Sequence, residues 1–90
     1  MPELFIGIGH GNAAQASQVV AILNPASAPV ARLRAEARQA GRLLDASQGR
    51  RTRSVLVMAS GHVIESALEV RSLTEKFNRA FQAREDAARP

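Results

Sequence analysis

The fold is decided in the middle of the chain by two apolar runs, Arg53-Ser54-Val55-Leu56-Val57-Met58-Ala59 and His62-Val63-Ile64-Glu65-Ser66-Ala67-Leu68. Both runs are rich in β-branched residues, and the pair Ser60-Gly61 between them is typical of a tight turn. A shorter run, Leu43-Leu44-Asp45-Ala46, precedes them and is separated from them by the turn residues Ser47-Gln48-Gly49. Three strands joined by short polar turns indicate an antiparallel meander.

Two further strands are expected nearer the N-terminus. The run Leu4-Phe5-Ile6-Gly7-Ile8 is ended by glycines and Asn12, and residues 18–23 are closed by the strong break signal Asn24-Pro25. Residues 13–17 between them stay ambiguous, because their alanines would accept one turn of helix.

Two helices are also expected. Ser27 is the expected N-cap of the first, Pro29 suits its first turn, and Gly41 is a natural stop. The narrow apolar face of this helix consists of Val30, Leu33, Ala37 and Ala40. The second helix is expected to open at the capping box Ser72-Leu73-Thr74-Glu75. Its apolar face consists of Leu73, Phe77, Ala80 and Phe81.

These elements follow one another in the order β-β-α-β-β-β-α. That order predicts a single α+β domain over residues 1–90, with two helices and a small, mainly antiparallel sheet. Residues 81–90 are expected to form a frayed or mobile C-terminal tail. The chain has no cysteine and no apolar run typical of a signal peptide or a membrane span, so we expect a cytoplasmic protein without a membrane partner.

The positive charge is concentrated in one part of the chain. Eleven of the 12 basic residues are arginine, and residues 32–53 hold seven of them against Glu36 and Asp45, a net charge of +5. The remaining residues carry a net charge of −1. Arginine suits phosphate because its planar fork donates two parallel hydrogen bonds. The charge alone is equally typical of a solvated helix face with a charged loop.

The strongest local feature is Gly49-Arg50-Arg51-Thr52-Arg53. Two consecutive arginines beside a turn, with Asp45 as the nearest acid in sequence, repel each other unless a polyanion or another acidic surface neutralises them. Thr52 adds a hydroxyl that can donate to phosphate. These residues therefore predict either a polyanion site or a contact with acidic residues of a neighbouring subunit.

Other motifs give weaker signals. The loop Gly7-Ile8-Gly9-His10-Gly11-Asn12 lacks the third glycine of a dinucleotide site, so a close approach of two backbones is expected, with a phosphate-ligand sensor as a further alternative. His10 and His62 have no neighbouring ligands that would predict a metal site. Ser60-Gly61-His62 lacks the spatial arrangement of a catalytic pair, so we predict no enzyme, no cofactor and no small-molecule substrate.

Several segments together resemble the RemA family of bacterial regulators of extracellular matrix (biofilm) genes. The resemblance covers residues 3–70 and rests on the glycine loop, Val20-Ala21-Ile22, Ser27-Ala28-Pro29, Asp45-Ala46, the arginine-rich segment and His62-Val63-Ile64. It implies a LytTR-like architecture, assembly into a homo-oligomeric ring, and activation of transcription by binding double-stranded DNA close to the nucleoid. Within that resemblance Arg50 and Arg51 match paired DNA-contacting arginines.

One position departs from the pattern. The family often has arginine where this chain has Gln18, which can still hydrogen-bond a phosphate or a base edge but releases no counterion. The expected DNA-binding residues are therefore Arg50, Arg51, Arg53 and Gln18, with Arg32 or Arg42 as further compensating cations. The alternative function is an oligomeric scaffold that binds proteins and not DNA.

Overall fold

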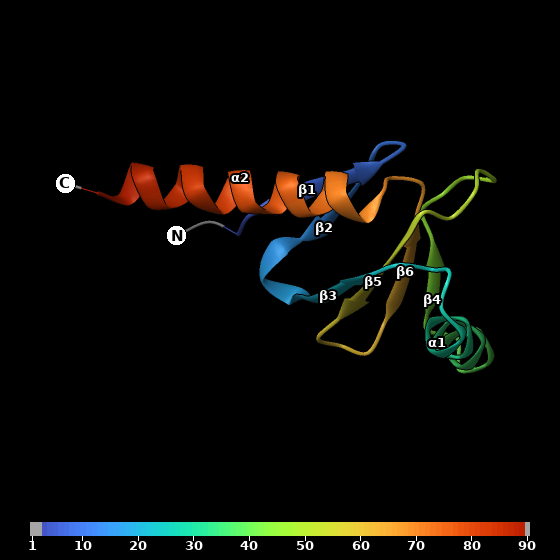
Figure 1. Cartoon of the computed structure of the whole chain (residues 1–90). Helices are drawn as coiled ribbons and strands as arrows, with labels where there is room; N and C mark the ends of the chain where they lie inside the picture. The colour runs from blue at the N-terminus through green and yellow to red at the C-terminus, as the bar shows by residue number, and fades with distance from the viewer. Residues whose placement is uncertain (1–2, 90) are drawn as a thin grey trace.

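A four-stranded sheet lies at the centre of the protein in the computed structural model, which describes residues 3–89 (Figure 1). Its strands lie side by side in the order β3 (Val19–Leu23), β5 (Ser54–Met58), β6 (Val63–Ser66) and β4 (Leu43–Asp45). The pairs β3–β5 and β5–β6 are antiparallel, whereas β4 runs parallel to β6. Strands β3 and β4 therefore form the two opposite edges of the sheet. The predicted α+β class, with two helices and a mainly antiparallel sheet, is confirmed.

The predicted meander is confirmed for β5 and β6 and is wrong for β4. Strand β4 does not pair with β5, which follows it in the chain, but pairs with β6, with Leu43 opposite Val63. The connecting residues 46–53 form no tight hairpin, because they cross the end of β6. There the Ala46 amide donates to the carbonyl of Glu65 and the Arg53 amide to that of Ser66. Strand β6 is buried along its whole length, with a neighbour on each side.

A separate antiparallel hairpin, β1 (Phe5–Gly9) and β2 (Asn12–Gln15), precedes the sheet. Its turn residues His10 and Gly11 have φ angles of 54° and 79°, as a type I′ turn requires. Residues 13–17, ambiguous in the sequence, thus hold most of an additional strand and the start of a single 3₁₀ turn, η1 (Ala16–Gln18). The strand predicted over residues 18–23 begins one residue later, at Val19.

The two faces of the sheet have separate apolar cores. Helix α1 (Ala28–Gln39) covers one face, where Val30 and Ala37 pack with Val55 and Val63. The hairpin and helix α2 (Val70–Ala88) cover the other, larger core, which includes Ile8, Leu56, Ile64, Leu73 and Phe77. Alternation along β5 and β6 divides adjacent residues between the two cores.

The ends of α1 follow the prediction and those of α2 do not. Ser27 caps α1 by accepting from the Val30 amide, and Gly41 beyond its end has a φ of 73°. Helix α2 begins at Val70 with Glu69 as N-cap, so the predicted capping box from Ser72 lies inside the helix.

Helix α2 also continues through the predicted tail as far as Ala88. Its last turns are rich in strong helix formers, and Gln82 donates to Asp86 one turn on. Pro90, the end of that predicted tail, lies outside the described residues. In the described part of the chain, neither helix carries an apolar stretch of the length that a membrane crossing needs.

Candidate nucleic-acid interface

The arginine segment, residues 49–53, lies at the end of the central sheet where the chain passes from β4 to β5. It starts in a tight turn, because the Arg50 amide donates to the carbonyl of Ser47 over 3.1 Å. The φ angles of Gln48 and Gly49 are 52° and 79°, so this turn too has the φ signs of type I′. Glycine has no steric cost in that conformation, which explains Gly49 directly before the arginines.

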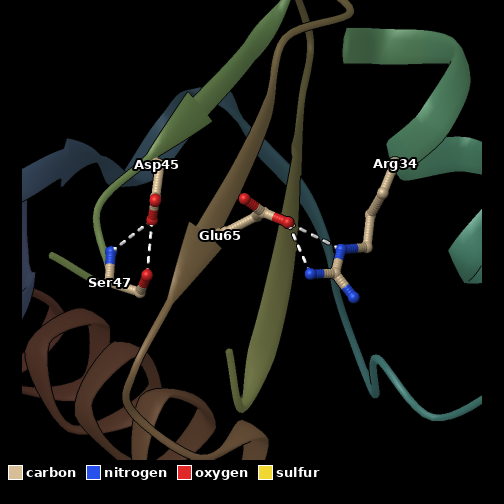
Figure 2. Close-up of polar contacts among 4 residues, drawn as sticks. All are labelled: Arg34, Asp45, Ser47 and Glu65. Carbon is tan, nitrogen blue, oxygen red and sulfur yellow. Dashed lines mark hydrogen bonds and ion pairs between the residues drawn. The ribbon is translucent and has the colours of Figure 1, made fainter. Parts of the chain in front are cut away.

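Asp45 anchors the turn from the β4 side (Figure 2). Its Oδ1 accepts hydrogen bonds from the Ser47 amide over 2.8 Å and from the Ser47 hydroxyl over 2.5 Å. These two hydrogen bonds lower the pKa of Asp45, because they stabilise its ionised form. At the other end the Arg53 amide donates to Ser66 on β6. Hydrogen bonds therefore hold both ends of the arginine segment. The turn at its start is bonded to Asp45 at the end of β4, and Arg53 at its end is bonded to Ser66 on β6.

The three arginines of this segment differ in their surroundings. Arg50 and Arg51 are exposed, and within residues 3–89 neither side chain makes a hydrogen bond or an ion pair. Arg53 lies 3.4 Å from Glu69, in a pair whose two side chains are mostly in contact with solvent. Such a pair contributes little to stability, so it leaves Arg53 available to an anion. Asp45, the nearest acid in sequence, hydrogen-bonds Ser47 and forms no ion pair with these arginines.

Gln18, the fourth predicted site residue, does not lie beside the arginine segment. Its carbonyl accepts from the amide of Ala59, which follows β5, whereas the arginine segment directly precedes β5. The length of this strand, at about 3.3 Å per residue, separates the two features by roughly 16 Å. Gln18 is exposed, and within one chain it lies apart from the arginine segment.

The glycine loop lies next to the arginine segment, a proximity that the sequence did not reveal. Gln48 donates to the carbonyl of His10 over 3.4 Å, and a cleft between the two turns is lined by His10, Arg50 and Arg51. The predicted close approach of two backbones is not what these glycines provide, because a Cβ on Gly9 would lie 3.3 Å from a side chain, that of Leu68. The β1–β2 turn therefore forms one wall of the cleft that Arg50 and Arg51 line.

Arg34 is one of the seven arginines of residues 32–53, for which the charge alone left open a solvated helix face, and its side chain is not fully solvated (Figure 2). It forms an ion pair of 2.5 Å with Glu65, a carboxylate that is buried on the sheet. These residues are 31 positions apart, so no local pattern predicts the pair. This ion pair holds the guanidinium of Arg34 near the arginine segment.

The expectation that Ser60 and His62 lack the spatial arrangement of a catalytic pair is wrong for their distance, because Oγ and Nδ1 lie 2.7 Å apart, within hydrogen-bond reach. The His62 amide also donates to Ser60 Oγ, so the contact belongs to the turn between β5 and β6. Among residues 3–89 no carboxylate hydrogen-bonds the imidazole, as a nucleophile–base pair would need. Nor does the described chain hold a group of three or more side chains suited to a metal ion.

The chain is similar over most of its length to bacterial proteins that are named as regulatory. The sequence profile of a family described as "RemA-like: Extracellular matrix regulatory protein A-like" matches residues 5–77. A protein of Desulfosudis oleivorans is 53% identical over 72 residues, which cover 80% of this chain and 74% of that protein. A protein of Oleidesulfovibrio alaskensis is 53% identical over 75 residues, which cover 83% and 89%. A protein of Synechococcus sp. is 47% identical over 77 residues, which cover 86% of each. All three bear the name "Putative regulatory protein".

Proposed function

The chain belongs to the RemA-like family of regulatory proteins, and we propose that it acts on transcription by binding duplex DNA through the arginine segment. The description of the family mentions the extracellular matrix, which supports extracellular matrix (biofilm) genes as the targets. In this proposal the protein is an activator and forms a homo-oligomeric ring near the nucleoid. Arg50, Arg51 and Arg53 contact phosphates, and Gln18 supplies a separate contact.

The observation that carries this proposal is the state of Arg50 and Arg51. Both guanidinium groups are exposed and unpaired within residues 3–89, on a segment that hydrogen bonds hold at both ends. Exposed arginines without acidic partners leave a local positive potential, which a nucleic-acid phosphate backbone neutralises with release of counterions. The low aromatic content, three phenylalanines and no Trp or Tyr, favours a duplex over unpaired bases, because unpaired bases need stacking partners.

Self-association is supported by apolar side chains at both edges of the sheet. Val20 on edge strand β3 is 69% exposed, and Leu44 on the opposite edge strand β4 is 49% exposed. Exposed apolar residues on an unpaired strand edge favour contact with another chain. Contact between different edges of successive subunits is head-to-tail, and head-to-tail contacts generate rings when the rotation closes.

The test is a gel shift with Arg50→Ala and Arg51→Ala on long and short duplexes across a salt series. The matched control is Arg79→Ala, which removes the same charge from an arginine on α2 that is exposed and has no partner within residues 3–89. We expect each segment variant to bind about tenfold more weakly, with a shallower salt dependence, while the control binds like the wild type. The mass of the assembly, from light scattering, should be unchanged in all three.

The same experiment distinguishes the alternative function, a scaffold ring that binds no DNA. In a scaffold, the arginines meet acidic residues of the next subunit, so Arg50→Ala and Arg51→Ala would dissociate the assembly. Wild-type affinity for DNA in both variants would overturn the proposed interface.

A further inference from the structure

A second cleft lies on the other side of the arginine segment. It has a volume of about 530 Å³ and is lined by Arg34, Arg51, Arg53 and Arg71, together with Glu69 and the loop of residues 24–26. These residues come from four places in the chain: helix α1, the arginine segment, the start of α2 and the loop after β3. Clefts of 300–1,000 Å³ are the usual size for small-molecule ligands.

The residues that line this cleft carry a net positive charge. Four arginines and one glutamate line it, which leaves a net charge of +3 among the lining residues. Two of its ion pairs are weak, since Arg53–Glu69 and Arg71–Glu75 each span more than 3.2 Å and lie at the surface. Arg51 has no partner within residues 3–89. An anion in the cleft therefore meets several guanidinium groups that no internal carboxylate neutralises fully.

Arg34 differs from the other three because the protein holds its guanidinium in place. Its Nε and Nη2 both donate to the same oxygen of Glu65, over 2.7 Å and 2.5 Å, and its side chain is 26% exposed. This leaves Nη1 without an acceptor among the described residues. A pre-oriented guanidinium with free N–H groups binds phosphate at a lower entropic cost than a mobile arginine does.

The first turn of α2 contributes to the same wall through Glu69, Val70 and Arg71. The side chain of its N-cap residue, Glu69, makes no capping hydrogen bond within residues 3–89, and the helix is 19 residues long. The positive end of its dipole adds to the field of the arginines.

We propose that this cleft is a binding pocket for a small organic polyanion, a molecule with two or more linked phosphate groups such as a nucleoside polyphosphate or pyrophosphate. The cleft is concave and partly walled by Arg34 and Arg71, which lie outside the arginine segment, so it suits a compact anion better than a straight duplex. Among residues 3–89 no aromatic side chain lines the cleft, so recognition is through the phosphates and not through a base.

This pocket also gives a means of regulation, and that part rests on the proposed function. Arg51 and Arg53 line the pocket and belong to the proposed DNA interface. A bound polyanion neutralises these two residues and weakens the attraction for DNA phosphates. Pocket and duplex therefore compete, and by linkage DNA weakens binding of the small anion by the same factor.

The test is isothermal titration calorimetry of the full chain with sodium pyrophosphate, ATP and adenosine as probes. Wild type should bind pyrophosphate and ATP and should not bind adenosine, which has the base and sugar but no charge. Binding of both anions without binding of adenosine would assign recognition to the phosphates, and binding of adenosine would overturn that assignment. No binding of either anion would overturn the pocket.

The decisive variant is Arg71→Ala, because Arg71 lines the pocket and lies outside the proposed DNA interface. The matched control is Arg79→Ala, two turns further along α2. We expect Arg71→Ala to weaken pyrophosphate binding about tenfold and the control less than twofold. Equal losses in the two variants would overturn the pocket, since they would show attraction by net charge alone.

A gel shift on the same samples separates this proposal from the proposed function. Arg71→Ala should bind a short duplex as the Arg79→Ala control does, and pyrophosphate should displace the duplex from the wild type. A larger loss of DNA binding in Arg71→Ala than in the control would mean that the cleft belongs to the duplex surface, which overturns the small-anion pocket. Pyrophosphate binding without any DNA binding would overturn the proposed function and leave the pocket standing.

Discussion

Among single residues, the ion pair between Arg34 and Glu65 places the strictest demand on the fold. Glu65 is buried on the face of the sheet that α1 covers, and Arg34 from α1 is its only charged partner within residues 3–89 (Figure 2). Removing one member of a buried pair leaves a desolvated charge, which costs more than the pair contributes when intact. The pair therefore fixes how α1 lies on the sheet, and it fixes one wall of the anion cleft.

We predict that Arg34→Met lowers the free energy of unfolding by about 3 kcal/mol, because it leaves the Glu65 carboxylate buried without a partner. Arg38→Met is the matched control, since Arg38 is one turn further along α1, is exposed and forms no salt bridge within residues 3–89, and it should change stability by less than about 0.5 kcal/mol. Adding Glu65→Gln to Arg34→Met should recover at least about 1 kcal/mol. Urea unfolding followed by circular dichroism measures all three. Equal values for Arg34→Met and Arg38→Met would show that the pair has no such role.

Among the structural elements, the turn of residues 47–50 decides how the arginines are presented. Asp45 holds it through two hydrogen bonds from Ser47, and these lower the pKa of Asp45 below its usual 3.8. A lowered pKa in the folded state means that this stabilisation is complete above pH 3.8 and is lost as the pH falls through the lower, folded value. At neutral pH the turn is therefore held at full strength.

Two variants of Asp45 separate its hydrogen bonds from its charge. Asp45→Asn and Asp45→Ala remove the same negative charge near the arginines, but asparagine keeps an oxygen that can accept from Ser47. We expect Asp45→Ala to bind duplex DNA several-fold more weakly than Asp45→Asn, because alanine leaves the amide and hydroxyl of Ser47 without their acceptor. Gel shifts at pH 7 measure the ratio. If charge alone mattered, the two variants would bind equally, and both more tightly than the wild type.

The elements also show what the sequence could and could not predict. Ser27 and Gly41 bound the first helix as expected, because capping depends on residues within one turn. The start of α2 was predicted three residues too late. The hydroxyl of Ser66 donates to the carbonyl of Ile8 and accepts from the amide of Leu68. These two hydrogen bonds turn the chain before Val70, where the helix begins. That cause depends on a contact across 58 positions, which no local capping pattern contains.

At the scale of the whole molecule, the strand order could not be predicted for the same reason, because it depends on contacts between residues that are distant in the sequence. The sequence showed that residues 43–46 form a strand but not which neighbour they choose, since pairing is settled by burial of β6 on both sides. For the candidate site, the sequence identified Arg50, Arg51 and Arg53 as one segment, because they are contiguous. It could not show that Gln18 lies at the far end of β5, nor that Arg34 and Arg71 join Arg51 around one cleft.

The last prediction concerns the head-to-tail contact that the two sheet edges support. Val20→Glu damages only the β3 edge and Leu44→Glu only the β4 edge, and because both side chains are exposed, neither change should disturb the core. A buried glutamate at a subunit contact is costly, so each variant alone should have the mass of one subunit in light scattering.

Mixing the two variants gives the sharper result. The Val20→Glu chain keeps an intact β4 edge and the Leu44→Glu chain keeps an intact β3 edge, so an equimolar mixture can form one contact and no second. The mixture should therefore have the mass of a dimer and should not grow to a ring. A self-complementary contact at either edge would behave differently, because the variant that retains that edge would dimerise alone. If either variant forms the full-sized assembly by itself, the strand edge that it alters is not part of the subunit contact.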